Sequence, residues 1–168
     1  MAPDGPAQTS GEVKTRIYLL ETFSLKQGTQ PARLHDYLSQ AALPALSKVH
    51  GGPKIVLEAL VAPQVPQVAM ILGFQSIADF WRVRGRLNED KELEKAFEAW
   101  QSGPEPPFEQ QANALLEATD YSPEVVPLDP PPKRPRIFEL RVYHSPSYQH
   151  LKAVHERFAG PEIKIRGS

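Results

Sequence analysis

Residues 16–23 read RIYLLETF and residues 136–143 read RIFELRVY, so one strand-like pattern occurs twice in the chain. Both segments open with Arg, Ile and an aromatic residue, Leu20 matches Leu140, and both close on an aromatic residue. Runs of this length that are rich in aliphatic and aromatic residues are typical of strands. We therefore expect an internal duplication, in which residues 16–23 open one complete module and residues 136–143 open a second copy.

The stretch between the two strands alternates between helix and strand periods. Residues 32–50 carry an apolar stripe at helical spacing that Pro44 is expected to kink, and Gly51-Gly52 ends it. Residues 54–61 and 67–74 are expected strands on either side of a turn. Ser76 to Asp79 has the spacing of a helix-capping box. A further helical stretch around residues 93–100 and a strand over residues 112–121 follow.

The expected order of the first module is therefore βαββαβ, with the second helical region in two pieces. That order suits an antiparallel sheet with helices on one face. The fold class predicted for the chain is α+β, with one ferredoxin-like module of the dimeric α/β-barrel type. The first strand and helix of a second copy would follow it.

Proline placement predicts the domain boundaries. Residues 1–15 are rich in Pro, Gly, Ala and Ser and are expected to be a disordered tail, and residues 16–121 form the complete module. Residues 122–135, SPEVVPLDPPPKRP, are a semi-rigid linker. Residues 136–168 form a truncated second module, with Ser145 and Pro146 opening its helix. Its strand would have two open edges, so another chain completes it, it docks on the first module, or the chain is a fragment.

Composition excludes several classes of protein. The chain has 168 residues, a net charge of −1 and no cysteine. Disulfides, thiolate metal sites and cysteine nucleophiles are thus excluded. Scattered Lys and Arg argue against a nucleic-acid partner. No apolar run is long enough for a membrane span, and the first residues resemble neither a secretory signal nor a transit peptide. A cytoplasmic protein is expected.

Several longer motifs resemble the NIPSNAP family. They are FELRVYHSP at residues 138–146, LKAVHERFAGPEIKI at 151–165, LPAL at 43–46, FQSIADFWRVRGRLNED at 74–90 and ALLEATDYSP at 114–123. The resemblance covers residues 16–165, and the segment from Glu139 to Tyr143 is its most specific part. It implies the dimeric α/β-barrel architecture, in which two ferredoxin-like sheets pair face to face around a cavity. Relatives in that superfamily include cofactor-independent monooxygenases, whereas the family itself is mostly of unassigned function.

Strand alternation sorts the candidate site residues onto two faces. Tyr18, Leu20 and Thr22 are expected to pack on the helices, as are Phe138, Leu140 and Val142 in the second copy. The opposite face carries Leu19, Glu21 and Phe23 in the first copy and Glu139, Arg141 and Tyr143 in the second. In a face-to-face barrel that face lines the cavity, with His144 at its mouth. The ligand-cavity candidates are therefore Glu21, Glu139, Arg141, Tyr143 and His144, unless Glu139 and Arg141 form a structural ion pair.

The remaining residues give no catalytic signature. The histidines do not have the spacing of a metal site, His35 and His50 look exposed, and His155 lies on an apolar stripe. Trp81 and Trp100 are expected in the core. No metal and no cofactor are predicted. There is no nucleophile elbow, no P-loop and no dinucleotide fingerprint.

Two functional hypotheses remain from these observations. The first is a binding or assembly module without enzymatic activity, which forms a homo-oligomer through its open sheet face. The second is a small-molecule enzyme, such as a cofactor-independent monooxygenase, with a ligand between paired sheets. A Leu19→Lys substitution is expected to dissociate the oligomer in either case.

Overall fold

The computed structural model of the protein describes residues 14–126, 133–134 and 136–162. They fall into two compact units. Unit 1 comprises the described residues up to Ala118 together with residues 124–126, and unit 2 comprises residues 119–123 and those from 133 onward. Most of the expected tail, part of the linker and residues 163–168 lie outside the described residues.

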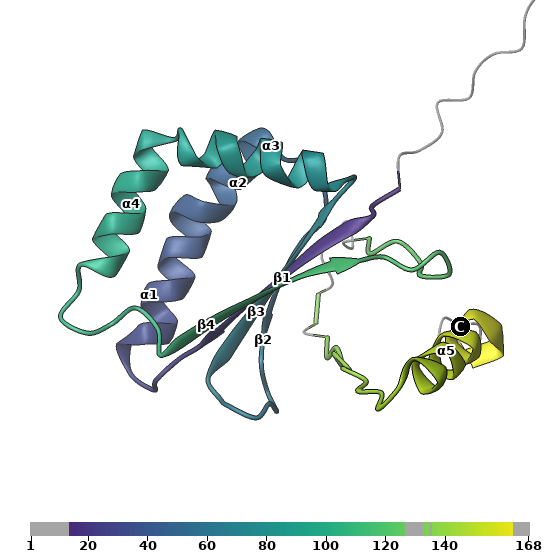
Figure 1. Ribbon diagram of the computed structural model, residues 1–168. Coiled ribbons are helices and arrows are strands. Elements are labelled where there is room, and N and C mark those ends of the chain that lie inside the picture. Colours follow the sequence, from purple (N-terminus) through teal and green to yellow (C-terminus); the bar gives the residue numbers. More distant parts are fainter. Residues whose placement is uncertain (1–13, 127–132, 135, 163–168) are drawn as a thin grey trace, which may run out of the picture. The chain divides into compact units, whose positions relative to one another are not determined.

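Unit 1 contains a four-stranded antiparallel sheet. Its strands are β1 (Ile17–Ser24), β2 (Lys54–Glu58), β3 (Gln67–Phe74) and β4 (Gln110–Glu117), in the spatial order β2-β3-β1-β4. β1 lies in the centre, with Leu20 opposite both Ile71 of β3 and Ala114 of β4. This is the predicted ferredoxin-like βαββαβ order (Figure 1).

The first helical region of unit 1 is one helix with an irregular turn. It consists of α1 (Thr29–Tyr37), a π-helical turn η1 (Leu38–Ala42) and α2 (Leu43–Val49). Pro44 sits in the first turn of α2. Because proline has no amide hydrogen and its ring crowds the preceding turn, the α-helical ladder is disturbed just before it. The irregularity that the sequence predicts at Pro44 is therefore present.

The second helical region consists of α3 (Ile77–Asn88) and α4 (Lys91–Gln101). Ser76 caps α3 by accepting a 3.1 Å hydrogen bond from the Asp79 amide, as its spacing predicts. Asp90 caps α4 through the amides of Glu92 and Leu93. The two caps explain why the region is broken into two helices.

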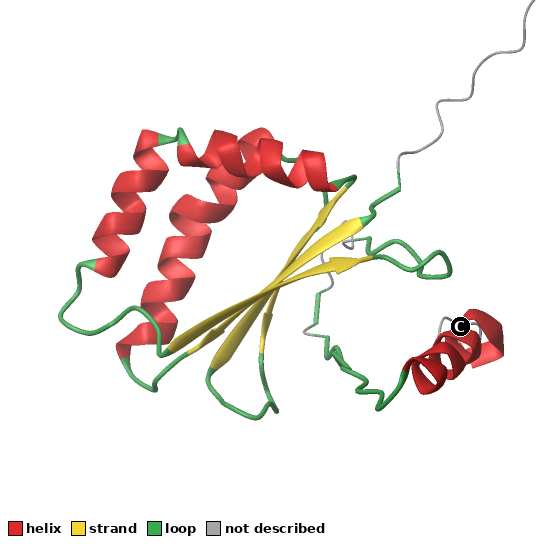
Figure 2. Ribbon diagram, viewed as in Figure 1, coloured by secondary structure: helices red, strands yellow, loops and turns green. Residues whose placement is uncertain are grey.

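All these helices lie on one side of the sheet, as Figure 2 shows for unit 1. The buried core lies between them and the sheet. It consists of Phe23, Leu25, Leu34, Leu38, Leu46, Val68, Met70, Leu72, Phe74, Phe80, Val83 and Trp100. Trp100 is buried as expected, whereas Trp81 is 58 % exposed on α3, where Arg84 lies over its ring.

The predicted faces of β1 are the reverse of the observed ones. Ile17, Leu19 and Phe23 pack into the core beneath the helices, while Leu20 and its alternating neighbours point to the uncovered side of the sheet. Both faces of β1 carry leucine, so the sequence alternation of this strand does not decide between them. The decision comes from β3, whose alternate residues from Val68 to Phe74 are buried.

Unit 2 contains a helix, α5 (Tyr148–Arg157), followed by a π-helical turn, η2 (Phe158–Glu162), that is kinked at Gly160. Ser147, rather than the expected Ser145, caps α5. The strand expected over residues 136–143 is wrong for the single chain, because residues 136–145 have no regular secondary structure. A strand needs a neighbouring strand to pair its backbone groups, and the described part of unit 2 offers none.

Within the described residues, no helix is both long and apolar enough to cross a membrane.

Candidate functional site

Four of the predicted cavity residues belong to unit 2. Glu139, Arg141, Tyr143 and His144 are all exposed in the single chain. Glu139 and Arg141 form an ion pair at 2.6 Å, which is the structural alternative that the sequence left open. The Tyr143 ring packs edge-on against Phe158, 5.3 Å between centroids.

Glu21 lies beneath the helices rather than on the open side of the sheet. Its carboxylate accepts a hydrogen bond from the side-chain amide of Gln111, and the amide of Asn113 donates to it at 3.2 Å in its favourable orientation. Burial raises the pKa of Glu21, while the Gln111 hydrogen bond and the charge of Arg84 oppose the increase. Glu21 is therefore a half-buried polar link between β1 and β4.

A cleft of about 830 Å³ lies at the end of the sheet where β1 begins and β3 ends. Its walls come from the loop after α2, from the start of α3 and from residues 124–126. The lining residues are Thr15, His50, Gly51, Gly52, Pro53, Lys54, Gly73, Gln75, Asp79, Arg82, Glu124, Val125 and Val126. All of them belong to unit 1.

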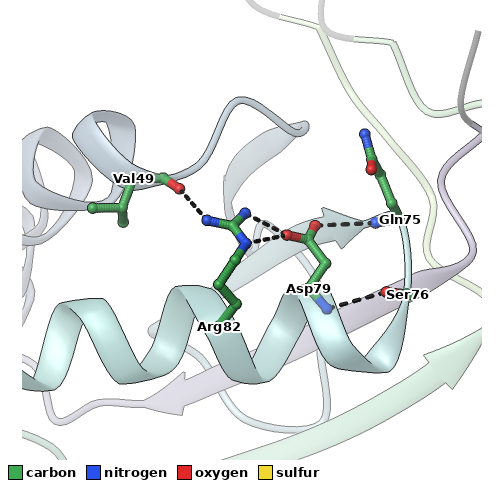
Figure 3. A network of polar contacts seen from close by, with 5 residues as sticks. All are labelled: Val49, Gln75, Ser76, Asp79 and Arg82. Atoms are coloured by element: carbon green, nitrogen blue, oxygen red, sulfur yellow. Dashed lines mark hydrogen bonds and ion pairs between the residues drawn. The ribbon is translucent and has the colours of Figure 1, made fainter.

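One wall of the cleft is a polar network at the start of α3 (Figure 3). Arg82 pairs with the Asp79 carboxylate and donates a long 3.5 Å hydrogen bond to the Val49 carbonyl at the end of α2. The other Asp79 oxygen accepts from the Gln75 amide at 3.3 Å. Burial would raise the pKa of Asp79, but the hydrogen bonds from Arg82 and Gln75 outweigh it and lower the pKa. The network ties α2 to α3.

His50 is 5 % exposed and forms the floor of the cleft, so the expectation that it is exposed is wrong. Its ring stacks on Phe74 at 4.6 Å, and its Nε2 atom is buried without a partner of hydrogen-bond geometry. Burial lowers the pKa of His50, the nearby Lys54 lowers it further, and Asp79 and the Gly73 backbone oppose the decrease. The surroundings of the imidazole therefore favour its neutral form.

The loop over His50 requires glycine. A Cβ atom on Gly52 would lie 2.3 Å from the Gly73 carbonyl oxygen and 2.6 Å from Nε2 of His50. Lys54 closes the loop, since its ammonium donates to the carbonyls of His50 at 3.0 Å and Gly52 at 3.1 Å. A cation at this place also neutralises the carbonyl end of α2.

The charged groups of the cleft are already paired with neighbours. Lys54 binds backbone carbonyls, Arg82 binds Asp79, and Glu124 accepts a 2.6 Å hydrogen bond from the Thr15 amide. This balance favours a neutral or zwitterionic polar ligand over a strongly charged one. The cleft brings together no nucleophile with an adjacent base. Among the residues that the structure describes, no group of three or more His, Asp or Glu side chains could hold a metal ion.

Sequence reasoning missed this cleft because its residues come from five separate places in the chain. The available signals were Gly51-Gly52-Pro53 followed by Lys54, and the capping sequence that begins at Ser76. Each was correctly interpreted as a helix end or a helix start. Nothing in the sequence shows that these two helix ends meet above the same buried histidine.

The sheet order and the one-sided helices define a ferredoxin-like module. Among solved structures, it is similar to a NIPSNAP family protein from Agrobacterium tumefaciens, with a TM-score of 0.54 and 20% identity over 65% of this chain and 90% of that one. A second NIPSNAP family protein of that organism, described as of unknown function, matches with a TM-score of 0.54 and 20% identity over 66% and 95% of the two chains. An uncharacterised NIPSNAP domain protein from Burkholderia xenovorans matches with a TM-score of 0.54 and 14% identity over 64% and 99%.

The chain thus has the fold of NIPSNAP family proteins, as the sequence resemblance implied. No protein-family model matches the sequence, and a search of curated proteins finds no match either.

Proposed function

We propose that this chain is a binding and assembly module that pairs with a second copy of itself through the uncovered side of its sheet. The observation that carries the proposal is the composition of that side, which we call the open face. The register of the four strands places on it Tyr18, Leu20, Thr22, Ile55, Leu57, Ala69, Ile71, Gly73, Ala112, Ala114 and Leu116. None of these residues is charged.

An uncharged surface of this extent supports self-association. Four strands about 4.8 Å apart and about 27 Å long give a flat projection on the order of 500 Å². Because side chains project from the plane of the sheet, the accessible area is larger than this projection and approaches the roughly 800 Å² per partner that stable interfaces bury. Contiguous apolar patches of that size on a protein surface mark interaction sites. A second open face is the natural occupant, because it has the same shape, the same twist and the same lack of charge.

The cleft beside His50 supports a ligand-binding role in addition to assembly. Its volume of about 830 Å³ falls within the range of small-molecule sites, roughly 300 to 1,000 Å³. Its paired charges favour a polar ligand without net charge. The alternative of a small-molecule enzyme gains no specific observation, because the polar groups of the cleft bond to one another.

Two adjacent leucines of β4 provide a matched test of the assembly. Leu116 is 46 % exposed and lies on the open face, opposite Tyr18; Leu115 is 45 % exposed and lies on the other side, opposite Leu19. We expect the wild-type chain and Leu115→Lys to be dimeric by light scattering across a dilution series. Leu116→Lys is expected to be monomeric with an unchanged circular dichroism spectrum, because it would bury a charge in the interface.

A monomeric wild-type chain, or a Leu116→Lys variant that remains as dimeric as Leu115→Lys, would contradict the proposal. Leu19→Lys cannot serve as the test, since Leu19 packs against the core and its replacement would unfold unit 1.

A further inference from the structure

One edge of the sheet in unit 1 ends in a strand that pairs on one side only. β4 pairs with β1, and the described sheet has no strand beyond it. All eight residues of β4 are exposed, so the helices of unit 1 leave both of its faces accessible. An edge of this kind presents unpaired backbone groups that can accept another strand.

Unit 2 contains a segment with the composition of a strand but without a sheet. Residues 136–143 alternate between apolar side chains and the Glu139–Arg141 pair, yet they have no regular secondary structure. Their apolar side chains face solvent, with Ile137 83 % and Val142 68 % exposed. Such an exposed β-prone segment gains by adding to a sheet edge.

This segment repeats the strand to which β4 is already paired. Arg16 and Arg136 begin the two copies of the pattern, 120 positions apart. The π-helical turns η1 and η2 begin at Leu38 and Phe158, which are separated by the same 120 positions. Because the separation is the same at the start of the pattern and at the helix end, residues 136–143 can be matched one to one with residues 16–23. The segment therefore matches β1, the strand whose side chains already fit those of β4.

The two faces of the segment also match the two faces of β4. On β4, Ala112, Ala114 and Leu116 lie on the open face, whereas Gln111, Asn113, Leu115 and Glu117 lie on the other, which is mostly polar. In the corresponding register, Phe138, Leu140 and Val142 would extend the apolar face. Glu139 and Arg141 would extend the polar one. A pairing register shifted by one residue would place Arg141 beside an alanine of β4 on the apolar face.

We propose that residues 136–143 of one chain add as an antiparallel fifth strand to the free edge of β4 in a second copy of the chain. By the repeat, Leu140 would lie opposite Ala114, as Leu20 does on the other side of β4. A second copy is the occupant, because it carries the same free β4 edge, and residues 136–143 have no regular secondary structure in the single chain. This contact is separate from the open face and does not depend on it.

The absence of cysteine from the chain allows a direct crosslinking test. Leu140→Cys protein is mixed with full-length chains that carry one cysteine on β4, and disulfide formation under mild oxidation is followed by the mass of the product. Ala112→Cys and Ala114→Cys lie on the same face as residue 140, whereas Asn113→Cys lies on the opposite face. Disulfides need Cβ atoms about 4 Å apart and pointing toward each other. We expect mixed covalent dimers with at least one alanine position and at least tenfold fewer with position 113.

Each other result would overturn the proposal. Absence of mixed dimers, or equal yields at positions 113 and 114, would show that the segment does not pair with β4. A chain with both Leu140→Cys and Ala114→Cys that closes its own disulfide at all dilutions would show pairing within one chain. Repeating the mixture in an Ile55→Lys background separates this edge contact from the open-face contact. Ile55 lies on the open face of β2, at the other edge of the sheet from β4, so crosslinking should persist although the open-face contact is lost.

Discussion

β1 and residues 136–143 carry the same sequence pattern but differ in structure. β1 lies at the centre of a four-stranded sheet, between β3 and β4, and its Phe23 side chain is buried. The second copy lies in no sheet, and its apolar side chains are exposed. The difference shows that a strand pattern is only a preference, which neighbouring strands must satisfy.

The helices that follow the two segments are more alike. α1 and α5 both form, and both pass into a π-helical turn at the corresponding position. A helix makes its backbone hydrogen bonds within itself, so it can form before its tertiary partners are present. The described part of unit 2 therefore contains a helix but no strand.

The largest expected effect is the difference in unfolding free energy between a substitution in the core of unit 1 and one in α5. Leu34 of α1 is fully buried, and the repeat places Val154 of α5 at the corresponding position, where it is only partly buried. Leu34→Ala is expected to lower the free energy of unfolding of unit 1 by about 3 kcal/mol through lost burial and a cavity. Val154→Ala should lower it by less than about 0.5 kcal/mol. Urea unfolding followed by fluorescence of the buried Trp100 measures both.

Equal losses of unfolding free energy in these two variants would contradict the expected difference. Such a result would mean that Val154 contributes as much to stability as Leu34 does.

A smaller effect is expected at the two serine caps. Ser76 accepts from the Asp79 amide in unit 1, and Ser147 accepts from the His150 amide at 3.3 Å in unit 2. Ser76→Ala is expected to lower the free energy of unfolding by about 1 kcal/mol. Ser147→Ala should leave that free energy unchanged and only increase the hydrogen-exchange rate of the first turn of α5. A loss of global stability in Ser147→Ala would contradict this expectation.

The fold could be predicted from the sequence where the signal is local. The hydrophobic periods, the Ser76 cap and Pro44 place the elements of unit 1 and their order. The side of β1 that packs on the helices could not be predicted, since Leu19 and Leu20 are equally apolar. It depends on β3, which is distant in sequence. The strand at residues 136–143 failed for the same reason, because pairing is not a local property.

The candidate site was harder to predict than the fold. Glu21 was predicted to face a ligand cavity on the open side of the sheet, whereas it lies on the side of β1 that packs beneath the helices. His50 appeared exposed because it follows the last turn of its helix and precedes two glycines. It is buried because Gly52 packs against its ring and Phe74 stacks on it, and both contacts arise only when the sheet has formed.

The smallest expected effect is a pH dependence of the free energy of unfolding that arises from His50 in unit 1. Because the pKa of His50 is lowered on folding, the unfolded chain binds a proton more tightly at this position. Stability should therefore fall as the pH decreases below the unfolded pKa of about 6.5. The charges of Lys54 and Arg82 strengthen this effect, whereas Asp79 and the Gly73 backbone weaken it.

His50→Phe retains a ring on Phe74 but removes the titrating group. The decrease in the free energy of unfolding between pH 7.5 and pH 5.5 should be smaller in this variant than in the wild-type chain. The other four histidines are exposed. An identical decrease in both proteins would show that His50 does not titrate differently on folding.

Amide hydrogen exchange of the two repeats in one sample tests most directly whether the second strand lacks a partner in the single chain. At the lowest concentration, residues 17–24 should exchange slowly, whereas residues 136–143 should exchange near the rate of an unstructured peptide. Protection of residues 136–143 should appear only as the concentration rises. Equal protection of both segments in the dilute monomer would contradict the account, since it would mean that the second copy finds its strand partner within its own chain.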